Sequence, residues 1–195
     1  MIKFLKKLFS SQTEYIVATI NARIQPIHRG EIYEDPLDDI LKRESVGEIV
    51  GGGTLQSETG EIEYCEIEIE VSNSDQLTID LVRKSLEQLG VPKGSKLLIE
   101  STDTVIEFGE LEGLGIYLNG TDLDDEVYAN CDSNHVYTEL DRLTEGTGRV
   151  FSFWQGETET AFYLYGSSFD AMKSMISELV ENYPLCQKCR IEQVA

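Results

Sequence analysis

Apolar and polar residues alternate along the first half of the chain with the periods of strands and helices in turn. This half is predicted to contain, in order, a strand at 15–23, a helix at 36–44, strands at 48–56 and 61–71, a helix at 75–89 and a strand at 96–100. Asp35 is a good N-cap for the first helix, and Pro36 suits its first helical position. The order of elements is therefore β-α-β-β-α-β.

The second half repeats this order with little identity of residues. The pattern predicts a strand at 107–118, a polar loop at 119–130, a helix at 133–145, strands at 149–155 and 158–165, a helix at 168–183 and a strand at 185–194. The two hairpins begin near Gly47 and Gly148, an offset of 101 residues. We therefore predict an α+β protein of two tandem ferredoxin-like sandwiches, each a sheet with helices on one face, over residues 13–101 and 102–195. The alternative is one continuous sheet with helices on one face.

The first twelve residues have a different character. Lys3, Lys6 and Lys7 interrupt the apolar positions, so the segment lacks the apolar run of a signal peptide. We expect an amphipathic cap at 1–12 that folds back on the acidic chain, with weak binding to an anionic membrane as the alternative. No stretch approaches the roughly 18 apolar residues of a membrane span. Four cysteines without an export signal favour reduced thiols and a cytoplasmic location.

The charge is strongly unbalanced. The 195 residues include 36 Asp and Glu against 16 Lys and Arg, a net charge of −20, and residues 8–195 alone carry −23. Such a surface repels phosphate backbones, so we expect no nucleic-acid partner. A cationic protein is the partner that this charge attracts.

Two acidic clusters and one aromatic residue are the candidate partner-binding positions. Glutamates recur along the strand at 61–71, and a slip in the alternation at Cys65 and Glu66 suggests a bulge that brings them to one side. The acidic loop lacks the ligand spacing of a calcium site. The alternative for the strand is a solvated face that opposes edge aggregation, and for the loop it is a solvated loop. The candidate residues are Glu61, Glu63, Glu66, Glu68, Glu70, Asp122, Asp124, Asp125, Glu126 and Trp154.

Two short motifs invite chemistry. Cys186 and Cys189 form a CxxC pair, but they follow a predicted helix, whereas a redox pair precedes one. Zinc would need two further ligands, for which Cys131 and His135 are the candidates, so we expect free thiols and no metal. Glycines 51–53 lie inside a predicted hairpin arm, where a bulge or a close backbone approach fits better than a phosphate loop.

Catalytic chemistry has little support in the sequence. His28 and His135 are the two histidines, and no nucleophile and base occur at a recognisable spacing. We therefore expect a binding protein without a cofactor, not an enzyme. The leading hypothesis is an immunity or antitoxin-type inhibitor that occludes a basic, nuclease-like toxin. The alternative is a regulatory or small-ligand-binding module that uses a cleft between the two halves.

Overall fold

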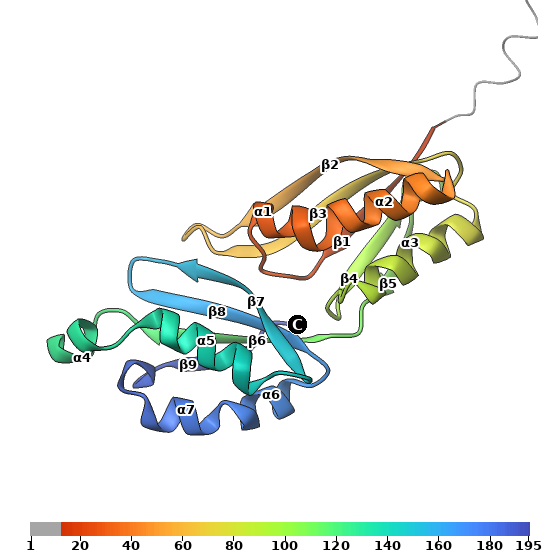
Figure 1. Cartoon of the computed structure of the whole chain (residues 1–195). Coiled ribbons are helices and arrows are strands. Elements are labelled where there is room, and N and C mark those ends of the chain that lie inside the picture. The colour runs from red at the N-terminus through yellow and green to blue at the C-terminus, as the bar shows by residue number, and fades with distance from the viewer. Residues whose placement is uncertain (1–12) are drawn as a thin grey trace, which may run out of the picture.

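The computed structural model describes residues 13–195 and contains two antiparallel sheets, each with helices on one face (Figure 1). The expected cap at 1–12 lies outside these residues. The strands are β1 Glu14–Ile20, β2 Gly47–Gln56, β3 Ile62–Val71, β4 Ser95–Ile99, β5 Thr104–Phe108, β6 Glu112–Asn119, β7 Gly148–Gln155, β8 Glu159–Gly166 and β9 Arg190–Gln193. The helices are α1 Pro26–Arg29, the π-helix η2 Gly30–Glu34, α2 Asp35–Glu44, α3 Gln76–Gln88, α4 Asp125–Asn130, α5 Ser133–Leu143, α6 Phe169–Met175, α7 Ser177–Asn182 and the 3₁₀ turn η3 Pro184–Cys186.

The strand orders confirm two ferredoxin-like sandwiches in tandem. The first sheet runs β2-β3-β1-β4-β5 and the second β7-β8-β6-β9, so each carries the same four-strand arrangement and the first adds one edge strand. In the first half, β1, β3 and β4 pack their apolar side chains against α2 and α3. In the second half, β6, β7 and β8 pack against α5 and α6. No helix within residues 13–195 has the length and hydropathy that crossing a membrane requires.

The two hairpins share details of geometry at the expected offset. β2 begins at Gly47 and β7 at Gly148, and each glycine lies so close to the neighbouring strand that a Cβ would meet a backbone oxygen, at 2.1 Å and 3.0 Å. The register then shifts at Val50 in β2 and at Phe151 in β7, which are also 101 residues apart. The repeat therefore extends to the position of a β-bulge.

Several predicted elements need correction. The single strand expected at 107–118 is two strands, because Gly109, at φ 100°, turns the chain between them. β5 pairs with β4 in the first sheet, whereas β6 is central to the second. The division of the chain between residues 101 and 102 stays a prediction, although residues 104–108 are bonded to the first sheet.

The remaining differences concern helices and the bulge. Residues 26–34, expected as a loop, are helical and continuous with α2, and residues 125–130 of the expected loop form α4. The helix expected at 168–183 is divided at Ile176, and the last strand is shortened by η3. The bulge in β3 lies at Glu63 instead of Cys65 and Glu66, because Gln56 pairs with Ile62 and Leu55 with Tyr64.

The halves are joined by a shared apolar core. The face of the second sheet that carries no helix presents Tyr117, Phe151, Tyr163 and Tyr165, and these side chains belong to the same buried cluster as the core of the first half. This face is therefore covered by the first half, which Figure 1 shows lying across β7 and β8.

A polar cluster around Glu61 crosses this junction. The hydroxyls of Tyr163 and Tyr117 donate to the same Glu61 carboxylate oxygen at 2.6 and 2.7 Å, and Arg23 forms an ion pair with that oxygen. The Arg23 backbone N–H also donates to the Tyr165 hydroxyl at 2.8 Å. Burial alone would raise the pKa of Glu61, but the hydrogen bonds from the two tyrosines and the charge of Arg23 hold it below its ordinary value.

A second ion pair explains part of the glycine run. The π-helix turn brings Arg29 and Glu34 to one side, where Arg29 Nε donates to Glu34 at 2.7 Å and Nη1 to the Gly53 carbonyl at 2.6 Å. A Cβ on Gly52 would lie 2.7 Å from the Glu34 carboxylate and 3.1 Å from the Arg29 guanidinium. Gly52 therefore gives the ion pair its space. The same Cβ would lie 2.8 Å from the Glu66 carbonyl oxygen, which is the close backbone approach expected from the sequence.

Glu61→Gln should lower the free energy of unfolding by about 2 kcal/mol at pH 7, because it removes the charged acceptor of several hydrogen bonds. The folded-state pKa of Glu61 is lowered, so its stabilisation is complete above the ordinary carboxyl value of 4.5 and is lost as the pH falls below it. Urea unfolding should therefore show that the difference in free energy of unfolding between the variant and the parent is smaller at about pH 3.5–4 than at pH 7. Glu63→Gln, at an exposed position, is the control, and equal effects of the two changes would contradict this role.

Gly52→Val should destabilise the protein by about 2 kcal/mol, within the cost of forcing extra atoms into a filled space. Gly53→Val is the matched control, because its Cβ would meet only the Glu66 carboxylate, at 3.9 Å. Thermal unfolding compares the two variants, and equal midpoints would show that the Arg29 pair does not need the gap.

Candidate functional site

The first sheet has a helix-free face that stays exposed, unlike its equivalent in the second half. We call it the open face. Residues alternate along each strand, so the positions between the core residues share this face. It includes Tyr15, Val17 and Thr19 on β1, Glu48 and Leu55 on β2, Tyr64, Glu66, Glu68 and Glu70 on β3, Lys96 and Leu98 on β4, and Val105 and Glu107 on β5.

The centre of the open face is apolar. Val17 pairs with Leu98, and Leu98 pairs with Val105, so three aliphatic side chains lie side by side across β1, β4 and β5. Val105 is 56% exposed, whereas Val17 and Leu98 are half-buried. Tyr15, two residues from Val17 along β1, is 38% exposed. Partly exposed apolar side chains that adjoin on a sheet are the kind of patch at which proteins interact.

Carboxylates surround this centre. Glu68 pairs with Val17 on one side, and Glu107 follows Val105 by two residues on the other. Glu70 pairs with Glu48 across β2 and β3, an unfavourable juxtaposition of like charges. Lys96, 3.8 Å from Glu107, is the cation among the residues of the open face. An apolar centre within a charged rim is the usual anatomy of a protein interface.

The local field is visible in Tyr15. Its hydroxyl lies 3.4 Å from a Glu70 carboxylate oxygen. The charge of Glu70, with smaller contributions from burial and from Glu100, raises the pKa of Tyr15 above its ordinary value. A cation placed on the open face would be stabilised by the same field.

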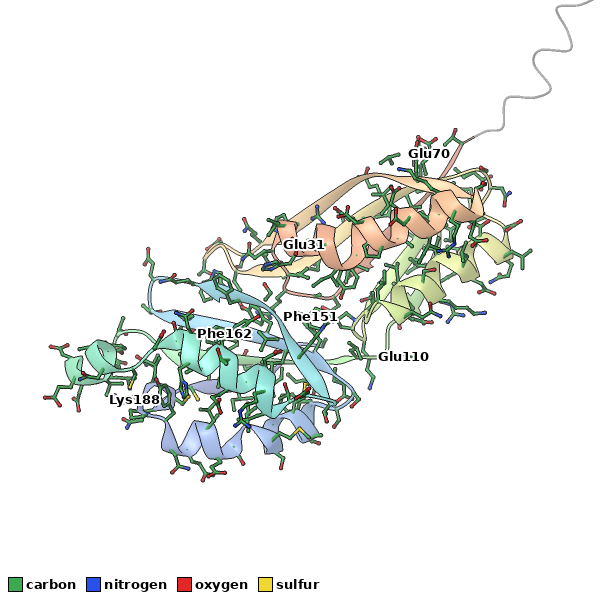
Figure 2. The ribbon with its side chains drawn as sticks, in the orientation of Figure 1. Glu31, Glu70, Glu110, Phe151, Phe162 and Lys188 are labelled. Atoms are coloured by element: carbon green, nitrogen blue, oxygen red, sulfur yellow. The ribbon has the colours of Figure 1, made fainter. Side chains whose placement is uncertain are left out.

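The predicted partner-binding residues fall into separate places. Glu66, Glu68 and Glu70 lie together on the open face, and Glu63 is exposed at the bulge beside it. Glu61 instead points into the junction between the halves, where it is part of the polar cluster. Figure 2 shows Glu70 at the outer end of the first half.

The other acidic cluster and Trp154 belong to the second half. Asp122, Asp124, Asp125 and Glu126 are exposed before and within α4, which lies at the far end of the second half in Figure 1. The structure therefore does not bring the two acidic clusters together. Trp154 is half-buried on β7 and packs against the core shared by the halves.

Sequence reasoning missed the apolar centre of the open face. The alternation of Tyr15, Val17 and Thr19 with buried Ile16 and Ala18 carries the signal, but the pairing with β4 and β5 is needed to show that the residues form one patch.

The cysteines are free thiols. Burial raises the pKa of Cys186 to about 12, with the neighbouring thiols of Cys189 and Cys131 adding to the effect. Within residues 13–195 no three His, Cys, Asp or Glu side chains are grouped in a way that could hold a metal ion. The thiol of Cys186 is therefore protonated at neutral pH, which makes it a poor nucleophile.

No protein-family model matches the chain, and no curated protein matches it. Solved structures resemble it at low identity. The first two RRM domains of yeast poly(U)-binding protein are 11% identical over 92% of this chain and 99% of that one, with a TM-score of 0.26. The structure of TiaS in complex with tRNA(Ile2), AMPCPP and agmatine is 10% identical over 85% of this chain and 56% of that one, with a TM-score of 0.34. The ligand-free regulatory subunit of aspartate kinase from Thermus thermophilus gives 11% over 85% and 91%, with a TM-score of 0.27. With TM-scores below 0.5, these likenesses carry no argument about function.

The combined change Glu66→Gln, Glu68→Gln and Glu70→Gln should leave the fold intact and raise the free energy of unfolding by up to about 1 kcal/mol. The reason is that it removes repulsion along β3 and between Glu70 and Glu48. Urea unfolding at low salt measures the gain, which should shrink at high salt because screening weakens the repulsion in the parent. A loss of stability would show that these carboxylates are paired favourably.

Proposed function

We propose that this protein is a binding module that docks a cationic partner protein on the open face of its first sheet. The observation that carries the proposal is that the helix-free faces of the two sheets, which are equivalent in the repeat, differ in exposure. The helix-free face of the second sheet is buried by the first half, while that of the first sheet stays exposed with an apolar centre and an acidic rim. An exposed face of this composition is typical of a surface that binds a partner.

Charge supports the choice of a cationic partner. The net charge of −20 exceeds the magnitude of about 2–8 that suffices for solubility of a small domain. Repulsion among like charges costs folding stability, so a compensating use is expected. Long-range attraction would speed association with a basic protein, and the apolar centre would then add contact energy that salt does not screen.

The proposed partner class is a basic, nuclease-like toxin, and the proposed role is that of an immunity or antitoxin-type inhibitor. A nuclease needs cationic side chains around its active site to bind phosphates. An acidic face with an apolar centre would compete with the nucleic acid for those side chains. Inhibition by occlusion needs no catalytic group on this chain.

The test is a pull-down at low ionic strength from the cells that make the protein, with mass spectrometry of what elutes in salt. We expect a basic protein that binds the parent chain and loses nuclease activity when bound. For that partner, the change of Glu66, Glu68 and Glu70 to Gln should slow association by about tenfold and flatten its salt dependence.

The matched control changes Asp122, Asp124 and Asp125 to Asn, which removes the same charge far from the open face. It should slow association by less than about twofold, since distant charges are screened over roughly 8–10 Å. Equal slowing by both variants would contradict docking on the open face. A captured partner without nuclease activity would contradict the inhibitor role while leaving the docking surface in place.

A further inference from the structure

A cavity of about 560 Å³ lies where the two halves meet beside the edge of β7. His28 of α1 and Ile32 of η2 line it from the first half, and residues of α5, β7 and β8 line it from the second. Its volume is within the range of about 300–1,000 Å³ that small-molecule sites occupy. The cavity lies away from the open face and is therefore not part of the proposed docking surface.

Aromatic rings form much of the wall. Phe151 and Phe153 come from β7, Phe162 from β8 and Tyr137 from α5. Figure 2 shows Phe151 and Phe162 on the second sheet, on the side toward the first half and beside α5 respectively. Tyr137 meets Phe162 edge to face with ring centroids 5.9 Å apart, while Phe153 is 45% exposed. Such walls suit a flat ring, which can stack or meet them edge to face.

Two residues of the wall have unsatisfied polar atoms. Ser152 is 3% exposed, yet its Oγ has no hydrogen-bond partner, and neither has the buried Nδ1 of His28. Within residues 13–195 these are the two buried side-chain polar atoms without a partner, and both residues line the cavity. Buried polar groups are nearly always hydrogen-bonded in folded proteins, so two unpartnered atoms on residues of one cavity wall are unusual. Each atom exposes less than 1 Å² in the free protein, so a ligand would bond to it after a small movement of the neighbouring side chains.

The wall carries no Asp, Glu, Lys or Arg side chain, although 27% of the chain is charged. An anionic ligand would find no cation there and would enter against a net charge of −20. The start of α5 gives an anion no compensation, because Asp132 caps it and accepts from the Asn134 backbone N–H at 2.8 Å. The net charge of −20 would attract a cation to the protein, but the wall offers a cation no carboxylate to pair with. The lining itself therefore favours an uncharged molecule.

We propose that this cavity binds an uncharged, flat heteroaromatic molecule, with the ring between the aromatic side chains and polar edges toward Ser152 and His28. Asn134 and Gln155 supply further amide donors and acceptors at the wall. The site is built from both halves, so ligand binding stabilises the arrangement in which the halves are joined. Ligand binding in this cavity is a function separate from docking of a protein on the open face, and neither depends on the other.

The experiment uses matched pairs of neutral and charged compounds with the same ring: adenosine and its monophosphate, nicotinamide and nicotinate, and indole and indole-3-carboxylate. Binding to the full chain is followed by calorimetry and by the fluorescence of Trp154, which is next to Phe153 and is the single tryptophan. We expect at least one neutral compound to bind, and its charged counterpart to bind at least about tenfold more weakly.

Substitutions in the wall test whether the compound binds in this cavity. Ser152→Ala should weaken binding by about fivefold to tenfold. The same change should leave the thermal midpoint of the free protein unchanged or raise it, because it removes an unpartnered hydroxyl. Phe153→Ala should also weaken binding, at a largely exposed position where folding tolerates the change. Ser174→Ala, on the exposed side of α6, is the control and should change neither quantity.

Each other outcome overturns part of the inference. If no neutral compound binds at millimolar concentration, the cavity is not such a site. If the charged counterparts bind equally well, the ligand class is wrong. If Ser152→Ala lowers the thermal midpoint and leaves affinity unchanged, the serine serves the fold.

Discussion

The carboxylate of Glu61 is the interaction on which the arrangement of the two halves depends. One oxygen accepts hydrogen bonds from Tyr117 and Tyr163 of the second sheet and pairs with Arg23 of the first half. Burying this carboxylate at the junction without partners would be costly, so the hydrogen bonds from Tyr117 and Tyr163 are what allow the halves to pack over it. The rings of the surrounding tyrosines add apolar contact at the same junction and so contribute stability. The polar cluster fixes how the two halves are oriented, because its hydrogen bonds are directional.

This junction gives two similar sandwiches different roles. Phe151 and Val50 occupy the same bulge position in the repeat, but Phe151 is buried against the first half and Val50 is 46% exposed. The second sheet uses its helix-free face to hold the protein together, while the first keeps its face available. The cavity follows from the same packing, because α1 and η2 reach the edge of β7 only when the halves are joined.

The order of the elements could be predicted from the sequence because turns and the alternation along a strand depend on neighbouring residues. Gly47 and Gly148 open equivalent hairpins, and alternation along β3 identified Glu66, Glu68 and Glu70 as one face. Periodicity could not show that Glu61 turns inward, since its partners are 38, 56 and 102 residues away. Pro26, at the first position of α1, is a helix signal comparable to Pro36, but the π-helix that follows brings together Arg29 and Glu34, a pairing that periodicity does not predict. The cavity was beyond sequence reasoning because its wall comes from five elements.

The distribution of charge connects the two surfaces. Acidic side chains crowd the outer strand faces and loops, whereas the wall of the cavity has none. A carboxylate in that wall would lie beside aromatic rings, where losing hydration costs more than a neighbouring charge could return. The strong outer field would therefore steer cations to the open face, while the wall of the cavity offers a charged ligand no partner of opposite charge. Partner docking and ligand binding would then be selected by charge at two separate places on one chain, with the Glu61 junction between them.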